Sequence, residues 1–344
     1  MILAGIAVGA LGLYSVSRLD TLGLARPSGE SVVETEAETT TSRAMSAAAT
    51  VPPDEPAIPG TEPIAPAAVA QETDSATSSP TPPAILPQLE PDDIAALQAL
   101  PPSETWLANA LPAVDSGGWP MVAIVIDDVG VNRANAPGAI GLPAPVTLSF
   151  MSYAEGLADM TQQARARGHE LMLHLPMEPV DPTNDPGPHG LRLSQSAMEI
   201  EANVHWALAR FDGYIGVNNH MGSLFTRSTE GMALVLAELR RRGLMFLDSR
   251  TVADSAGARV ASELGVPNLA RDVFLDNDPA AAAIVGQLAE LERIARERGY
   301  AIGIGHPYPS TLAALNAWLP TLQARGIVAV PVSTILRQKL GVAG

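Results

Sequence analysis

The sequence contains no cysteine and a single lysine, and each scarcity excludes a class of function. Without cysteine the chain has no disulfide, no cysteine-type zinc site and no thiolate nucleophile. Binding to a nucleic-acid backbone requires clustered lysine and arginine side chains, whereas the formal net charge here is −16. We therefore expect no nucleic-acid partner.

The acidic residues are concentrated near the start of the chain. Residues 1–118 hold fifteen of the 37 acidic residues and three of the 21 basic residues, so the remainder is close to electrically balanced. Residues 19–118 are rich in Pro, Ala, Glu and Thr, as in VPPDEPAIPGTEPIAPAA. Such a segment buries too little apolar surface to offset the entropy cost of ordering it, which predicts a disordered linker. Within it, residues 91–100 have the pattern of one or two helical turns.

Residues 1–16, MILAGIAVGALGLYSV, are almost wholly apolar and are followed closely by Arg18. A run of this length fits the hydrophobic region of a secretory signal or a short membrane anchor, and a buried helix of a globular domain is the alternative. No lysine or arginine precedes the run, which leads us to expect further residues upstream. We assign residues 1–18 as a signal or membrane anchor, and we expect a cell-envelope or periplasmic protein that contacts the membrane through them.

From residue 119 onward, short apolar runs alternate with amphipathic ones. VAIVID (122–127) is rich in β-branched residues, which is typical of a strand buried on both faces. Seven similar runs follow, at 146–150, 170–174, 214–217, 244–248, 272–276, 301–305 and 327–332. Alternation of strands with helices predicts an α/β fold with a parallel sheet, either a barrel or a doubly wound sheet. The number of units favours a distorted (β/α) barrel of seven or eight strands over residues 119–344.

Polar residues follow the predicted strands where a parallel barrel carries its functional site. Three of the six histidines in the chain lie at such strand ends, which is difficult to explain by packing alone. The loop of residues 177–193, long enough to cover the barrel mouth, is a candidate substrate lid. By contrast, we expect His169 to be a solvated surface residue. The candidate site residues are Asp127, Asp128, His174, Glu178, Asn219, His220, Asp248, Arg250 and His306.

Seven motifs occur in a characteristic order: VAIVIDDVG, GHELMLHLPMEP, DPTNDPGPHGL, GVNNHMGSLFT, FLDSRT, ARDVFLDN and IGIGHPYPST. Together they resemble the divergent polysaccharide deacetylases, relatives of the carbohydrate esterase family 4 deacetylases, over about residues 119–340. The resemblance implies a metal-dependent hydrolase that removes acetyl groups from a cell-envelope polysaccharide. It also implies that Asp127 is the base, Asp128 a metal ligand and His306 the acid.

The implied metal ligands depart from the family pattern at one position. The main family has two histidines four residues apart, whereas here His174 is followed by Glu178. Either Glu178 takes this position, or His220 supplies the second imidazole. We favour His220 because it directly follows a strand, and two imidazoles with one carboxylate suit Zn²⁺. The residues expected to support the base or the acid, or to hold the substrate, are Glu178, Asn219, Asp248 and Arg250.

The missing histidine keeps two other functions open. The chain could be a catalytically weak or inactive glycan-binding or scaffold protein of the envelope, or a metal-dependent hydrolase with another substrate. A Mg²⁺ site for phosphoryl transfer at Asp127 and Asp128 is disfavoured, because no glycine-rich phosphate loop with a lysine follows them.

Overall fold

The computed structural model describes residues 86–88, 90–99 and 104–342. The apolar segment 1–18 and the linker up to residue 85 lie outside the described residues, so the expectations for them stay predictions. No helix in the described part combines the length and the apolar character needed to cross a membrane.

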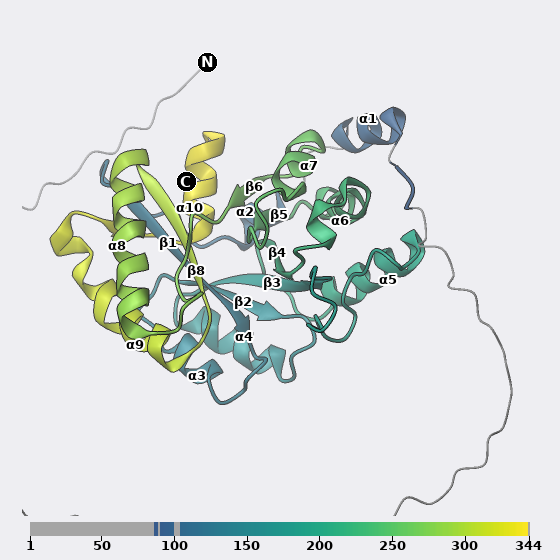
Figure 1. Cartoon of the computed structure of the whole chain (residues 1–344). Coiled ribbons are helices and arrows are strands. Elements are labelled where there is room, and N and C mark those ends of the chain that lie inside the picture. Colours follow the sequence, from purple (N-terminus) through teal and green to yellow (C-terminus); the bar gives the residue numbers. More distant parts are fainter. Residues whose placement is uncertain (1–85, 89, 100–103, 343–344) are drawn as a thin grey trace, which may run out of the picture. The chain divides into compact units, whose positions relative to one another are not determined.

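A parallel sheet lies at the centre of the fold, with the strand order β6-β5-β4-β3-β2-β1-β8-β7 and β9 paired beside β1 (Figure 1). Although β6 and β7 follow each other in the chain, they form the two edges, and no ladder joins them within the described residues. The sheet is thus a curled, incompletely closed barrel, which confirms the predicted fold class. Its strands are β1 (Met121–Val129), β2 (Thr147–Met151), β3 (Glu170–Met177), β4 (Gly216–Met221), β5 (Met245–Asp248), β6 (Asn268–Ala270), β7 (Val273–Phe274), β8 (Tyr300–Gly305) and β9 (Val328–Ala329).

The continuous apolar run of strand β1 contributes side chains to two hydrophobic cores. Successive side chains of a strand point to opposite faces of the sheet. Ile124 and Ile126 therefore belong to the core beneath the outer helices, whereas Ala123 and Val125 belong to the core inside the curled sheet. Neither face meets water, so no polar residue interrupts the run before Asp127.

Helices surround the outside of the sheet (Figure 1), and their ends follow local chemistry. Ser196 and Glu199 form a reciprocal capping box at the start of α5. Gly299, with φ of +86°, ends α8 in a left-handed conformation that favours glycine. The helices are α1 (Pro91–Ala99), α2 (Thr105–Asn109), α3 (Ala136–Ile140), α4 (Leu157–Ala166), α5 (Ala197–Leu208), α6 (Thr229–Arg242), α7 (Gly257–Glu263), α8 (Ala281–Arg298), α9 (Pro309–Trp318) and α10 (Val332–Leu340).

Residues 104–118, expected to belong to the linker, pack against the barrel instead. Trp106 in α2 is only 3% exposed, and its backbone N–H donates to the Gly243 carbonyl at 2.9 Å. The Asn109 amide donates to the Tyr214 carbonyl at 2.8 Å. The expectation of disorder is therefore wrong for this stretch, because Trp106 is buried in the inner core and Leu107, Ala110 and Val114 pack against that core.

A buried carboxylate closes the end of the barrel opposite the strand termini that carry the candidate site. Glu170 opens β3, is fully buried, and accepts hydrogen bonds from the Thr147 hydroxyl at 3.2 Å and the Ser333 N–H at 3.1 Å. Ser333 lies in the first turn of α10, where unpaired N–H groups favour an anion. Burial nevertheless raises the pKa of Glu170. The adjacent His169 is fully buried, and its Nε2 lies 3.0 Å from the Ile140 carbonyl, so the expectation of a solvated surface residue is wrong.

Candidate functional site

The carboxyl-terminal halves of strands β1, β3 and β4, together with the residue after β8, bring the predicted chemical residues together. Asp127 and Asp128 come from the end of β1, His174 from β3, His220 from β4, and His306 directly follows β8. All except Asp128 line one cavity of about 230 Å³, and Asp128 contacts His174 and His220 at its wall. Residues up to 179 positions apart in the chain, Asp127 and His306, thus meet at one mouth of the curled sheet.

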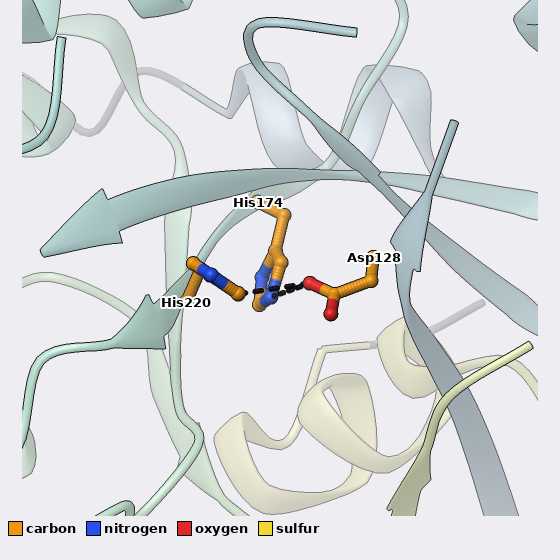
Figure 2. A group of neighbouring side chains, drawn as sticks. All are labelled: Asp128, His174 and His220. Atoms are coloured by element: carbon orange, nitrogen blue, oxygen red, sulfur yellow. Dashed lines mark ion pairs between the residues drawn. The ribbon is translucent and has the colours of Figure 1, made fainter. Parts of the chain in front are cut away.

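Asp128, His174 and His220 point toward one another (Figure 2). Asp128 Oδ1 lies 2.8 Å from His220 Nδ1 and 3.3 Å from His174 Nε2, and the three ligand atoms lie within 4.8 Å of one another. Neither contact has the geometry of a hydrogen bond, which leaves Asp128 Oδ1 buried without a donor. One carboxylate oxygen and two imidazole nitrogens are typical ligands of a divalent cation, so these three residues fit a metal ion.

The backbone at this cluster is strained. Asp128 has φ of +57° and Met221, which follows His220, has φ of +50°. Non-glycine residues rarely adopt this left-handed region, and each such residue costs roughly 1–3 kcal/mol. Within the cluster, the strained residues direct the Asp128 carboxylate and the His220 ring to one point. Such strain is commonly found at ligand-binding and catalytic sites.

The electrostatics of the cluster favour a cation. Burial opposes ionisation of Asp128, but the His174 and His220 rings outweigh it and hold the pKa of this carboxyl well below its ordinary value. Burial likewise lowers the pKa of His174, but Asp127 and Asp128 outweigh it and raise that pKa to about 9. The two carboxylates therefore attract a positive charge at this position, either a proton or a metal ion that displaces it.

Asn218 connects the base candidate to the metal cluster. It is fully buried in β4, and its Oδ1 lies 2.9 Å from His174 Nδ1. Its Nδ2 donates to Asp127 Oδ1 at 2.8 Å. Because Asn218 Oδ1 accepts the Nδ1 proton, Nε2 of His174 is free to bind a metal. Sequence analysis overlooked Asn218, although its position two residues before His220 places both side chains on the same face of β4.

Asp127 has the environment of a general base. Its side chain is 3% exposed, and its Oδ2 lies 3.7 Å from His174 Nε2. Burial raises the pKa of Asp127 above its ordinary value, despite the opposing charges of His174 and His306. A carboxylate with a raised pKa is a stronger proton acceptor than an ordinary aspartate.

His306 is held by a second carboxylate that sequence analysis left without a role. Its Nδ1 lies 2.9 Å from Asp276 Oδ1, and its backbone N–H donates to Asp276 Oδ2 at 2.6 Å. The Thr311 hydroxyl also donates to Asp276 Oδ2, at 2.7 Å. These bonds turn Nε2 toward Asp128, 3.9 Å from its Oδ2. Burial lowers the pKa of His306, but the Asp276 hydrogen bond and the charges of Asp128 and Asp127 raise it above the ordinary value.

Glu178 and Asp248 shape loops and do not line the cavity. The Glu178 carboxylate accepts the Leu193 N–H at 2.7 Å, which ties together the two ends of the loop of residues 177–193. Asp248 accepts the Arg250 N–H and the Ser255 hydroxyl, both at 2.8 Å. Among the described residues it bonds to neither Asp127 nor His306, so the expectation that it orients them is not met. The alternative metal ligand, Glu178, is engaged elsewhere.

Asn219 and Arg250 do line the cavity, as does Arg271, which sequence analysis did not select. Asn219 Oδ1 accepts the Ser249 N–H at 2.9 Å, and its Nδ2 donates to the Met221 carbonyl at 2.8 Å. Asn219 thereby joins the ends of β4 and β5, which is a supporting role.

Comparisons with known proteins agree with the resemblance carried by the motifs. Residues 124–336 match the family of divergent polysaccharide deacetylases. An uncharacterized protein of Haemophilus influenzae is 36% identical over 202 residues, 58% of this chain and 71% of that protein. The uncharacterized protein YibQ of Escherichia coli is 34% identical over 218 residues, 63% of this chain and 67% of its own length. The crystal structure of the uncharacterized protein ATU2773 from Agrobacterium tumefaciens C58 has a TM-score of 0.66 and 32% identity, and it covers 73% of this chain and 99% of that one.

Proposed function

Because the chain belongs to the family of divergent polysaccharide deacetylases, we propose that it is a metal-dependent hydrolase of acetyl groups on an N-acetylated polysaccharide of the cell envelope. One observation supports this proposal above all others. Asp128, His174 and His220 converge around a buried oxygen without a donor, with Asp127 and His306 beside them.

The cation would be held by Asp128, His174 and His220. Two imidazoles and one carboxylate with open positions suit Zn²⁺. When bound, such a cation polarises the acyl oxygen and acidifies a water molecule. Asn218 keeps the His174 ring in the tautomer that leaves Nε2 available.

Asp127 would remove the proton from the attacking water. Its carboxylate is oriented by Asn218 through the 2.8 Å hydrogen bond to Oδ1, which leaves Oδ2 free to accept a proton. Burial raises the pKa of Asp127, which brings it closer to the neutral range in which a general base works best.

His306 would donate a proton to the departing nitrogen or oxygen from Nε2. Asp276 fixes the ring through Nδ1 and raises its pKa against the effect of burial, so the protonated form is favoured. The base and the acid thus come from two adjacent strands beside the metal cluster, one at the end of β1 and the other directly after β8.

A glycan-binding scaffold is the alternative function, and the reason to consider it was the absence of the family's second histidine. His220 lies 2.8 Å from Asp128 Oδ1 and supplies an imidazole from the next strand, which weakens that reason. The apolar segment 1–18 supports a further part of the proposal, namely a location at the membrane of the cell envelope. Cell fractionation of the full chain tests that part separately.

Acetate release tests the chemistry. The purified chain, depleted of metal and reloaded with Zn²⁺, is incubated with acetylated chito-oligosaccharides and with peptidoglycan. We expect acetate release that falls by about 10²–10⁴-fold in Asp127→Asn, because general-base catalysis is removed. Asp159→Asn, at an exposed position in α4, is the matched control. Glycan binding without any acetate release in the metal-loaded wild type would instead support the scaffold.

A further inference from the structure

Two arginine side chains border the cavity of the candidate site. Arg250 follows β5, and Arg271 lies in the two-residue connection between β6 and β7. Both line the same space of about 230 Å³ as Asp127, His220 and His306. The mechanism proposed above assigns no role to either guanidinium.

The Arg271 guanidinium is held in place by neutral groups. Its Nε donates to the Ser249 carbonyl at 2.6 Å, and its Nη2 donates to the Arg250 carbonyl at 2.7 Å. Its central carbon lies 4.8 Å from the centroid of the Phe274 ring. An arginine has five N–H donors, and Nη1 makes no hydrogen bond within the described part of the chain. The guanidinium plane is therefore fixed while donors remain available.

Arg250 is positioned by its backbone and leaves its side chain free. Its φ is +48°, and its N–H bonds to Asp248 Oδ1 at 2.8 Å. The side chain is exposed, and no described residue forms a hydrogen bond or ion pair with its guanidinium. The exposed Arg293, by contrast, pairs with Glu290 and Glu297.

Two cations beside one cavity, neither in an ion pair with a described carboxylate, favour an anionic ligand. Burial lowers the pKa of Arg271; the charges of Asp127, Asp248 and Asp272 oppose this, and the charge of Arg250 lowers it further. An anion bound to both guanidinium groups would offset their mutual repulsion. The planar fork of a guanidinium binds a carboxylate through two parallel hydrogen bonds.

We propose that Arg250 and Arg271 form a carboxylate-binding subsite, so that the substrate is an acetylated glycan with a carboxylate close to the reacting acetyl group. This inference rests on the proposed deacetylase function and specifies its substrate class. A carboxylate fits better than a phosphate monoester, which carries about −1.5 to −2 charges. Asp127 lines the same cavity and would repel the phosphate more strongly.

Two probes that differ only in charge test the subsite. They are a disaccharide of N-acetylglucosamine and N-acetylmuramic acid with its lactyl carboxylate free, and the same disaccharide with this group converted to the amide. Binding to the full chain is measured by calorimetry at a fixed zinc concentration. We expect the free acid to bind at least about tenfold more tightly than the amide, as charge-assisted hydrogen bonds to arginine would provide.

Arg250→Gln should reduce this preference to less than about threefold, since the exposed side chain can be replaced without disturbing the core. Arg293→Gln, in α8 and away from the cavity, is the matched control and should keep the full preference. Unfolding curves verify that both variants fold. Arg271→Lys retains a charge without the planar fork, and its preference should fall between those of the wild type and Arg250→Gln.

Equal binding of acid and amide by the wild type would overturn the subsite, and so would an unchanged preference in Arg250→Gln. Tighter binding of the 6-phosphate of N-acetylglucosamine than of the carboxylated disaccharide would assign the arginines to phosphate and overturn the carboxylate. Because the charge preference is read from binding and acetate release is assayed separately, failure of the deacetylase proposal has a different signature. In that case the charge preference persists while no probe releases acetate.

Discussion

Asn218 and Asp127 are joined by a buried hydrogen bond of 2.8 Å between the amide Nδ2 and the carboxylate Oδ1. The same amide accepts the proton of His174 Nδ1 at 2.9 Å. One side chain in β4 therefore orients both the candidate base and one candidate metal ligand. Outer residues of this kind commonly set metal affinity and the direction of the ligands.

Replacing Asn218 should weaken the metal site and the base together. Asn218→Leu keeps a similar volume but removes the donor to Asp127 and the acceptor for His174. We expect zinc affinity, measured by competition with a chelator, to fall by about 10–100-fold. Asn316→Leu, at an exposed position in α9, provides the control. Unchanged zinc affinity in a folded Asn218→Leu protein would refute the orienting role.

The two possible second ligands can be separated by a pair of substitutions. His220→Ala removes a nitrogen that lies 2.8 Å from Asp128 Oδ1, whereas Glu178→Gln alters a carboxylate bonded to the Leu193 N–H. We expect His220→Ala to lose bound zinc on dialysis, as measured by elemental analysis, and Glu178→Gln to retain it. The reverse result would make Glu178 the ligand and His220 a bystander.

Periodicity and strand counting could predict the sheet because its core strands are apolar on both faces. Each of the eight predicted runs overlaps a strand of the structure. The missed strand, β6, has only three residues, Asn268–Ala270, and two of them are half-buried. A strand this short has no measurable period. Likewise α2 was not distinguished from the linker, because a helix of five residues is too short to show a helical period.

Part of the candidate site was predictable from carboxylate and imidazole side chains near the ends of predicted strands. Asp128, His174 and His220 were found in this way. Asn218 and Asp276 were not, because an amide within a strand and an acid at a strand end have many structural uses. Their roles depend on which residue lies across the sheet, such as His306 beside Asp276. Such pairing is a property of the fold and is not contained in local sequence.

The Asp276–His306 pair predicts a change in pH dependence. Burial lowers the pKa of His306, and Asp276 is the foremost group that raises it. An acid that must be protonated loses activity as the pH rises through its pKa. In Asp276→Asn the negative charge is gone, so the alkaline limb of the kcat/KM profile should move to lower pH. Asp278→Asn, two residues further along and exposed, should leave the limb in place.

Glu170 predicts a second pH effect, on stability and far from the candidate site. Its pKa is raised above the ordinary value of 4.5, chiefly by burial. Below that value both the folded and the unfolded chain hold the proton, and the contribution of Glu170 to stability is complete. As the pH rises, the unfolded chain releases its proton first. The free energy of unfolding should therefore decrease until the pH passes the pKa of the folded state, by at most about 1.4 kcal/mol per pH unit.

Glu170→Gln removes this titration while keeping a side chain of the same shape beside Thr147 and Ser333. Urea unfolding between about pH 4.5 and pH 8 measures the effect, and the variant should gain stability relative to the wild type as the pH rises. Glu155→Gln, at a side chain that is 85% exposed, is the control for a general loss of charge. A stability difference between Glu170→Gln and the wild type that stays constant across this range would mean that Glu170 is ionised in the folded protein. The hydrogen bonds from Thr147 and Ser333 would then outweigh the cost of burying its charge.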